Sequence, residues 1–281
     1  MKIIRNITDL NLFLDEFKRL FPLKKIGFVP TMGALHAGHI SLIKQANKQC
    51  NLVVCSVFVN PTQFNEQSDL EKYPRTEEAD IELLKSNACD VVFIPSEVDI
   101  YPNKKITYLI DLNGLDTVLE GKYRDNHFVG VCMVVERLFN LVTPNTAFFG
   151  IKDFQQVAII KYMVQQKKLN INIVSCSITR EESGLAMSSR NMLLSEKQKK
   201  EAVVISQALF KGVDAYKNGL QLADVLTIMQ QILGQSTLKV EYLEIVDNDT
   251  LQNVTQINQN STVCIAAYCG KVRLIDNCQF S

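Results

Sequence analysis

The sequence has no long apolar run, no net charge and no internal repeat. None of its apolar stretches approaches the ~20 residues that a membrane helix needs. Residues 1–20 alternate charged side chains with Leu and Phe, whereas a signal peptide has an apolar core. Thirty basic residues balance thirty acidic ones, which gives no support to a general nucleic-acid-binding surface. We therefore expect a cytoplasmic protein that binds neither membranes nor nucleic acids.

Cysteine pairing patterns are also missing. The chain has eight cysteines but no CxxC pair and no framework spacing. Cys55, Cys89, Cys132 and Cys176 lie within or beside apolar runs, where a thiol behaves as a small packing residue. We expect these cysteines to be reduced.

What the chain does have is a regular alternation of predicted strands and helices. With 281 residues, 47% of them hydrophobic, it is long enough for one large domain or two. Apolar strands are predicted at 25–29, 52–59, 91–94, 147–150 and 171–178. Helical patterns between them favour a Rossmann-like, doubly wound parallel sheet of the α/β class.

The pattern changes after residue 191. Two helices are predicted, the first opened by a capping box of Ser195 and Gln198 and the second at 222–234 with one apolar face. Three further strands follow. We expect a Rossmann-like domain in residues 1–176 and a smaller α+β domain in residues 177–281.

The most informative stretch is 28–46, FVPTMGALHAGHISLIKQA. Pro30 is expected to end the preceding strand, and Gly33 and Gly38 let the backbone turn close to a ligand. From His39 apolar residues recur at helical spacing. This places a helix N-terminus beside a sheet edge, where α/β folds bind phosphates.

Two of the three histidines, His36 and His39, lie in this stretch. They could form a structural pair, a metal site or a phosphate contact. A metal site is weakly supported, because no Cys, His or carboxylate lies nearby and Gly38 is expected to break the spacing that would point both rings at one ion. We favour phosphate contact, since imidazole donors beside a helix N-terminus suit an oxyanion.

Polar residues follow other predicted strands. Asn60 and Gln63 come after strand 52–59 and are equally able to line a ligand site or to cap a turn. Lys152 and Asp153 lie at a later strand-to-helix turn, where an ammonium offsets triphosphate charge and a carboxylate accepts from ribose hydroxyls. The alternative for these two as isolated residues, which we favour less, is surface polar groups with the aspartate as a helix cap.

A third group of phosphate donors lies near the predicted domain boundary. Ser188, Ser189 and Arg190 combine two hydroxyls with a guanidinium, and together they can donate to several phosphate oxygens. Further upstream, residues 119–131 read LEGKYRDNHFVGV; a surface loop explains their charges by default.

In chain order, the motifs PTMG, HxGH, NPxQF, LEGxxRxxHFxGV, GxKDxQQ and SSRN are spread along residues 28–191. This set resembles the pantothenate synthetase family of the HxGH nucleotidyltransferases. Two positions depart from the family pattern. Ile151 stands where glutamate is often found, and Ser183 stands where aspartate is usual.

The resemblance implies an ATP-dependent, AMP-forming ligase that joins pantoate to β-alanine through a pantoyl adenylate, in pantothenate biosynthesis. It implies Mg²⁺ bridging the ATP phosphates, no metal ion held by protein ligands, a homodimer, and closure by the second domain to exclude water. Catalytic roles fall to His36, His39 and Lys152, with His39 either transferring a proton or only donating a hydrogen bond.

The resemblance also implies the binding residues. Those for ATP are Met32, Gly33, Ala34, Leu35, His36, Ala37, Gly38, His39, Gly150, Ile151, Lys152, Asp153, Thr179, Met187, Ser188, Ser189 and Arg190. Those for pantoate and β-alanine are Pro30, Thr31, Met32, Asn60, Gln63, Arg124 and Gln156. Neutral amides suit pantoate, because they hold its carboxylate without lowering its reactivity as much as a cation would.

Two other functions share part of this pattern. An adenylyltransferase acting on a phosphate ester would share the nucleotide motifs, but it would need a basic pocket for the second phosphate. A non-catalytic nucleotide-binding module would explain the phosphate loops alone.

Overall fold

The computed structural model describes residues 1–64, 67–102 and 108–280. The chain forms two compact units. Unit 1 comprises Met1–Asn113, Arg124–Ile151 and Ile159–Ser177, and unit 2 comprises Gly114–Tyr123, Lys152–Ala158 and Ile178–Ser281. The last segment of unit 2 begins at Ile178, close to the boundary expected at residue 177. Unit 2 also contains two earlier segments, so a single boundary does not separate the two units.

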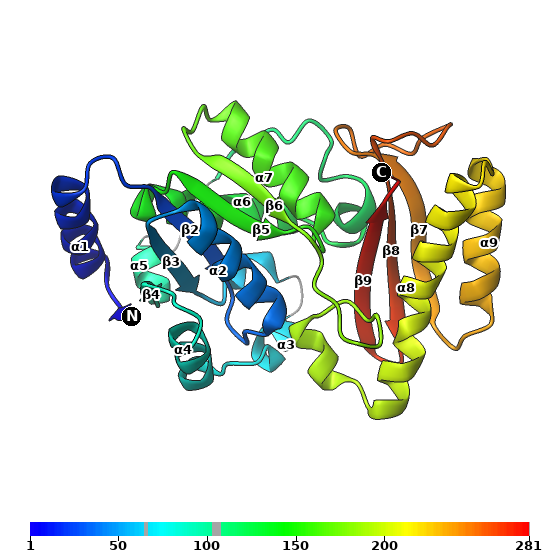
Figure 1. Cartoon of the computed structure of the whole chain (residues 1–281), viewed down its shortest axis with the longest axis horizontal. Coiled ribbons are helices and arrows are strands. Elements are labelled where there is room, and N and C mark those ends of the chain that lie inside the picture. The colour runs from blue at the N-terminus through cyan, green and yellow to red at the C-terminus, as the bar shows by residue number, and fades with distance from the viewer. Residues whose placement is uncertain (65–66, 103–107, 281) are drawn as a thin grey trace. The chain divides into compact units, whose positions relative to one another are not determined.

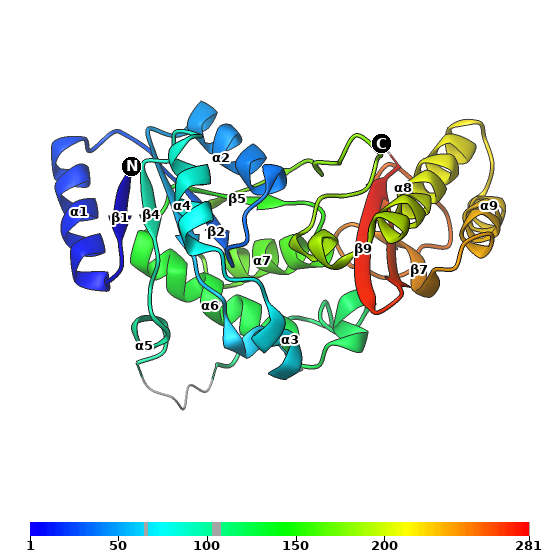
Figure 2. The same cartoon turned by 90° about the horizontal axis from the view of Figure 1, so that it is seen from below.

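Unit 1 is built on a six-stranded parallel sheet (Figure 1). Its strand order is β1-β4-β3-β2-β5-β6, and Figure 2 shows β1 beside β4. The strands are β1 (Lys2–Ile4), β2 (Ile26–Thr31), β3 (Leu52–Val57), β4 (Val91–Phe93), β5 (Thr146–Gly150) and β6 (Asn172–Cys176). The predicted doubly wound α/β sheet is confirmed.

Helices cover both faces of this sheet, because successive residues of a strand point to opposite faces. On one face Phe28 of β2 packs edge-on against Phe139 of α6 (His127–Val142), with ring centroids 6.3 Å apart. On the other face Val29 packs with Ile43 of α2 (Ala37–Gln49). The remaining helices are α1 (Ile7–Leu20), α3 (Gln67–Lys72), α4 (Glu77–Lys85), α5 (Glu97–Ile100) and α7 (Phe154–Gln166), the last shared by the two units.

Two local expectations in unit 1 are wrong. Strand β2 continues through Pro30 to Thr31, and Pro30 pairs in register with Ser56 of β3. The pairing of β2 with β5 covers only Gly27 and Phe28, so the proline interrupts no hydrogen bonding on that side. Helix α2 begins at Ala37 rather than at His39.

Unit 2 contains a three-stranded antiparallel sheet of β7 (Lys239–Asp247), β8 (Ser261–Cys269) and β9 (Val272–Gln279). Its core joins α8 (Glu196–Lys217) and α9 (Leu222–Gly234) to this sheet through Leu209, Met229 and Ile265. The capping box of Ser195 and Gln198 is present at the start of α8. The expected smaller α+β part is confirmed.

Two expectations from composition can also be compared with the structure. All eight cysteines have free thiols; Cys50 and Cys278 are half-buried and the other six are buried, as expected of small packing residues. Across residues 1–64, 67–102 and 108–280, no helix is both long and apolar enough to cross a membrane.

Candidate active site

The two histidines form the N-terminal cap of α2. His36 is the N-cap residue, and its Nδ1 accepts a hydrogen bond from the backbone N–H of Gly38 at 3.1 Å. The Nδ1 of His39 accepts from the backbone N–H of His36 at 3.3 Å, which completes a capping box. A neutral imidazole carries its hydrogen on one nitrogen only, so both rings carry it on Nε2. Each histidine is therefore an N–H donor beside the positive end of a helix.

The expectation that Gly38 breaks the helical spacing between the two histidines is wrong. Gly38 is part of α2, and the ring centroids of His36 and His39 lie 4.2 Å apart. Both Nδ1 atoms already accept backbone hydrogen bonds, which fixes the rings in one orientation. In the part of the chain that the structure describes, no group of three or more His, Cys, Asp or Glu side chains could hold a metal ion.

A carboxylate that sequence reasoning missed holds the loop in front of these histidines. Asp80 of α4 is only 2% exposed, and its two oxygens accept the backbone N–H groups of Ala34 at 2.9 Å and Leu35 at 2.8 Å. Ala34 adopts φ +50°, a left-handed conformation that costs a non-glycine residue about 1–2 kcal/mol. The two charge-assisted hydrogen bonds offset that cost. Asp80 gives no sequence signal, because its partners lie 45 and 46 residues earlier.

The segment after β3 forms the 3₁₀ turn η1 (Pro61–Gln63), and Asn60 caps it. The Asn60 Oδ1 accepts hydrogen bonds from the hydroxyls of Tyr101 at 2.7 Å and Thr62 at 3.0 Å. This orients the Asn60 amide so that its Nδ2 donates to Gln63 Oε1 at 3.1 Å. The Gln63 Nε2 donor then faces the sulfur of Met32, 2.9 Å away. Asn60 was expected either to line a ligand site or to cap a turn, and the structure shows the cap.

Tyr101, which sequence reasoning missed, keeps its hydroxyl proton and so keeps donating to this network. Its side chain is buried, and burial raises the pKa of Tyr101 to about 12, with the charge of Glu97 adding to the effect. The phenol thus remains a hydrogen-bond donor to Asn60 through the physiological range.

Helix α6 fixes the same turn from the other side. The His127 Nδ1 lies 2.8 Å from the backbone oxygen of Gln63. A Cβ atom at Gly130 would stand 2.5 Å from the backbone oxygen of Thr62, closer than real contacts allow. Only glycine permits this approach of η1 to α6, so α6 determines where the Gln63 side chain begins.

The other residues of unit 1 that were predicted to bind substrates surround the same end of the sheet. Thr31, at the end of β2, donates to the backbone oxygen of Ser56 at 2.7 Å and accepts from the N–H of Gly33 at 3.2 Å. Gly150 ends β5, and the backbone N–H of Ile151 donates to the backbone oxygen of Cys176 at 2.8 Å. Arg124 is half-buried just before α6. Unit 1 thus brings together the residues from 30 to 39 with Asn60 and Gln63.

Unit 2 carries the remaining predicted residues. Lys152 is half-buried and its backbone oxygen accepts from Asn277 Nδ2 at 2.9 Å, whereas Asp153 is exposed. Of the adjacent glutamines, Gln156 is half-buried, and the buried Gln155 donates to the backbone oxygens of residues 115 and 118. Gln155 is therefore a structural residue.

Ser188, Ser189 and Arg190 follow a tight hairpin over residues 179–187. Arg180 pairs with Ala186 in an antiparallel bridge, and the backbone N–H of Met187 donates to the backbone oxygen of Thr179 at 2.9 Å. Gly184 supplies the turn with φ +95°. The Ser188 hydroxyl caps η3 (Ser189–Leu193) by accepting from the Arg190 N–H at 3.3 Å.

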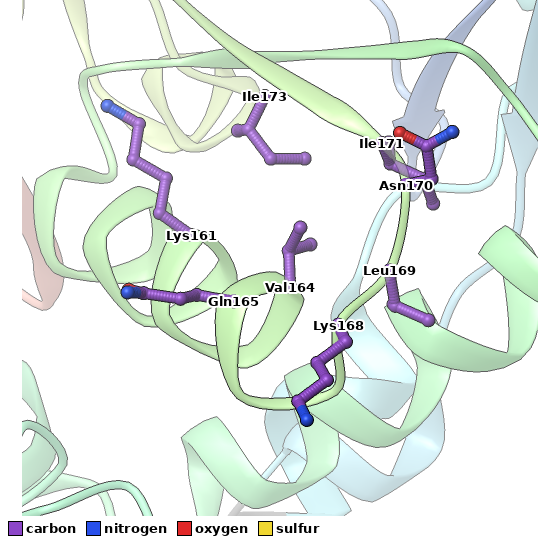
Figure 3. A pocket seen from close by; sticks show the side chains of 8 residues that line it. All are labelled: Lys161, Val164, Gln165, Lys168, Leu169, Asn170, Ile171 and Ile173. Atoms are coloured by element: carbon purple, nitrogen blue, oxygen red, sulfur yellow. The ribbon is translucent and has the colours of Figure 1, made fainter.

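A separate surface pocket of about 450 Å³ lies in unit 1 between the end of α7 and β6 (Figure 3). Its lining residues are Lys161, Val164, Gln165, Lys168, Leu169, Asn170, Ile171 and Ile173. None of the predicted substrate-binding residues lines it, and in Figure 3 the amines of Lys161 and Lys168 point away from each other. This pocket is not the predicted site.

Comparison with known proteins gives consistent matches along the whole chain. Residues 2–279 match the family described as pantoate-beta-alanine ligase. The pantothenate synthetase of Bacteroides fragilis is 47% identical over 282 residues, covering 100% of this chain and 99% of the relative. That of Acetivibrio thermocellus is 43% identical, covering 99% and 98%.

Two solved structures also match this chain over its whole length. Pantothenate synthetase from Thermus thermophilus matches with a TM-score of 0.94 and 36% identity, covering 100% of this chain and 99% of that one. The pantoate-beta-alanine ligase from Francisella tularensis, complexed with beta-gamma ATP and beta-alanine, matches with a TM-score of 0.82 and 37% identity, covering 100% and 98%.

Proposed function

The chain belongs to the pantoate-beta-alanine ligase family, and from this premise we propose how its residues carry out the ATP-dependent ligation of pantoate and β-alanine. The observation that carries the proposal is the capping box of His36 and His39, which supports two imidazole donors at the N-terminus of α2. Such donors suit the phosphates of ATP.

The reaction proceeds in two steps. In the first, a carboxylate oxygen of pantoate attacks the α-phosphorus of ATP, a new P–O bond forms, and the bond to the bridging oxygen breaks as pyrophosphate leaves. In the second, the neutral amine of β-alanine attacks the acyl carbon of the adenylate. A C–N bond forms, the C–O bond to AMP breaks, and the amine loses a proton.

The first step brings an anion to a polyanion and places extra charge on the phosphate oxygens. Donors fixed around those oxygens lower the barrier, each by about 3–4 kcal/mol in comparable oxyanion sites. In unit 1 the Nε2–H groups of His36 and His39 take this role. Their rings are held by backbone hydrogen bonds, so little reorganisation accompanies the reaction.

The pantoate side of the site uses neutral groups. Gln63 offers an Nε2 donor whose direction is set by Asn60, and Asn60 is in turn oriented by Tyr101. An amide donor binds a hydroxyl or carboxylate oxygen of pantoate without forming an ion pair. Pro30, Thr31, Met32, Arg124 and Gln156 complete the proposed set for pantoate and β-alanine.

Unit 2 supplies the other nucleotide contacts in this proposal. Lys152, Ser188, Ser189 and Arg190 donate to the phosphates, and Asp153 with Gly150 of unit 1 contacts the ribose. Adenine is bound by backbone groups near Thr179 and Met187. Because the Met187 N–H already donates within the hairpin, this contact uses other backbone groups of the pair.

ATP enters as its magnesium complex in this proposal. The metal is part of the substrate and supplies charge neutralisation on the phosphates. We also propose that the enzyme works in the cytoplasm as a homodimer, as the family resemblance implies; light scattering after size-exclusion chromatography tests the dimer through the particle mass.

The proposed function is tested by incubating the purified chain with ATP, pantoate and β-alanine. AMP and pyrophosphate are expected as products, and labelled pyrophosphate is expected to exchange into ATP only when pantoate is present. An adenylyltransferase would transfer AMP to a phosphate ester instead, and a non-catalytic module would show no exchange. Formation of ADP, or exchange without pantoate, would overturn the proposal.

A further inference from the structure

Two adjacent residues of β9, Asp276 and Asn277, are polar yet almost fully buried, with exposed fractions of 4% and 3%. Adjacent strand residues point to opposite faces of a sheet. Asp276 therefore lies on the face that packs with Ile265 and Leu274, and Asn277 on the face that carries Arg273. Each bonds to a segment that contains proposed ATP donors.

On the first face Asp276 holds the hairpin at 179–187. Its two carboxylate oxygens accept from Arg180 Nη1 at 2.6 Å and Arg180 Nη2 at 3.0 Å. The guanidinium also donates to the backbone oxygen of Gly184 at 3.2 Å and stacks over the ring of Phe210, 4.8 Å from its centroid. Arg180 is thus fixed from three directions, and the base of the hairpin with it.

The hairpin in turn holds residues 188–190, the serine segment, in place. Arg180 bridges Ala186, two residues before Ser188. Asn191, on the far side of the serines, donates from Nδ2 to the backbone oxygen of Ala186 at 3.0 Å and to Glu181 at 2.9 Å. Residues 188–190 are therefore held at both ends by the hairpin that Asp276 anchors.

On the second face Asn277 holds the backbone of Lys152. Its Nδ2 donates to the Lys152 oxygen at 2.9 Å, across 125 residues of sequence. Lys152 is the first residue of its segment in unit 2 and lies in the turn that joins β5 to α7. This hydrogen bond fixes where the lysine side chain begins.

Stability alone does not explain the Asp276–Arg180 pair. A buried ion pair loses so much hydration that well-packed apolar residues often replace it without loss of stability. What an apolar pair cannot supply is the directional two-point geometry of a carboxylate with a guanidinium.

We propose that Asp276 and Asn277 are positioning residues for the adenylation step: from opposite faces of β9 they fix the serine segment and Lys152 at one separation, without touching substrate. The proposal rests on the proposed ligase function. Because a displacement of about 1 Å at a reacting group can cost a hundredfold in rate, losing either anchor is expected to slow adenylation. Pantoate binding is expected to stay nearly unchanged, because six of the seven residues assigned to it lie in unit 1 and only Gln156 lies in unit 2.

The first experiment measures pantoate-dependent exchange of labelled pyrophosphate into ATP, together with pantoate binding by calorimetry. Asp276→Asn is expected to lower exchange at least ~10-fold and raise the KM for ATP, with the Kd for pantoate unchanged. The matched control is Asp247→Asn, which makes the same change on β7, where the carboxylate accepts from Thr250 and Asn260. It is expected to keep wild-type exchange.

Asp276→Asn leaves Arg180 buried without its carboxylate and can unfold the chain. The paired change Arg180→Met with Asp276→Leu avoids this, because no charge stays buried. It is expected to fold, as shown by a cooperative thermal transition, and still to lose exchange at least ~10-fold. A folded double variant with wild-type exchange would overturn the proposal.

The second experiment tests whether Asn277 acts through Lys152. Asn277→Asp removes the donor and is expected to lower exchange at least ~10-fold in the wild-type background but less than ~3-fold in a Lys152→Ala background. Equal losses in both backgrounds would contradict the proposal. If the wild-type chain itself shows no pantoate-dependent exchange, the ligase assignment falls instead.

Discussion

The carboxylate of Asp80 shows how one buried side chain sets the geometry of the loop before the proposed catalytic histidines. It accepts the N–H groups of Ala34 and Leu35, which precede the capping histidine His36. Nothing in the residue types marks Asp80, since an acidic residue in the first turn of a helix is explained by the helix dipole alone. Its role depends on a contact across 45 residues of sequence, which spacing cannot predict.

Asp80→Asn tests this role. The amide keeps the shape but turns one acceptor into a donor, so one loop N–H faces another N–H. We expect the free energy of unfolding to fall by about 2 kcal/mol and adenylation to fall at least ~10-fold. Urea unfolding and pyrophosphate exchange measure the two effects. The control Glu78→Gln changes an exposed residue of the same helix and should alter neither; an Asp80→Asn chain that matches it in both would refute the role.

The histidines themselves were predictable as donors but not as caps. Their place before an apolar helical pattern predicted a phosphate site, whereas the acceptor role of each Nδ1 depends on backbone dihedrals at the helix start. The same limit applies to Gln63. Its motif pointed to substrate, but its orientation follows from Tyr101 through Asn60, a contact that the sequence does not indicate.

At the scale of elements, the helices whose start or buried face depends on neighbouring residues in the sequence were predicted well. α8 begins where its capping box predicted, and α9 buries Val225, Met229 and Leu233 on the face that the 3.6-residue period indicated. β2 was predicted too short, because proline usually ends a strand; the parallel partner β3 continues beside Pro30 and Thr31. Long-range pairing of this kind overrides the local rule.

The contact between α6 and η1 gives a test at this scale. Gly130→Ala would place a methyl group 2.5 Å from the Thr62 oxygen, so η1 must shift and carry Gln63 with it. We expect the KM for pantoate to rise at least ~10-fold and stability to fall by about 1–3 kcal/mol. Steady-state kinetics and thermal unfolding measure these effects.

Gly234→Ala is the matched control for that change. Gly234 is the last residue of α9, and a Cβ there would have no atom within 4 Å. Activity should stay at the wild-type level, and stability should rise by up to about 1 kcal/mol, because alanine favours the helix. If Gly130→Ala behaves in the same way as this control, α6 does not position Gln63.

At the scale of the whole molecule, the make-up of unit 2 could not be predicted from order along the chain. The segment Gly114–Tyr123 belongs to it. Arg273 of β9 binds the Glu120 carboxylate through two nitrogens at 2.6 and 2.9 Å, and Tyr242 donates to the same carboxylate at 2.7 Å. Glu120 and Arg273 are 153 residues apart, so only the folded chain reveals the pairing.

Buried thiols and phenols make the whole molecule sensitive to alkaline pH. Burial raises the pKa of Cys89 to about 12 and that of Tyr101 to about 12, above their usual values near 8.5 and 10. As pH rises from about 8.5 to 12 the unfolded chain releases these protons first. Stability is therefore complete below this window and is lost as pH rises through it.

Thermal unfolding between pH 7 and pH 10.5 checks this prediction. The melting temperature should fall above about pH 8.5, and the fall should be shallower in a Cys89→Ala variant, whatever the absolute stability of that variant. A melting temperature that rises with pH, or an equal slope in the variant, would contradict it.

The central claim is that the residues at the N-terminus of α2 and at the turn before α7 stabilise transfer of AMP to pantoate. Pantoate-dependent exchange of labelled pyrophosphate into ATP tests it most directly, in the wild-type chain and in His39→Ala, Lys152→Ala and the control Lys161→Ala, which alters only the surface pocket of Figure 3. We predict that His39→Ala and Lys152→Ala bind pantoate nearly as before and lose about a hundredfold or more in exchange, while the control keeps it. Exchange at wild-type rates in His39→Ala, or exchange without pantoate in the wild type, would contradict the claim.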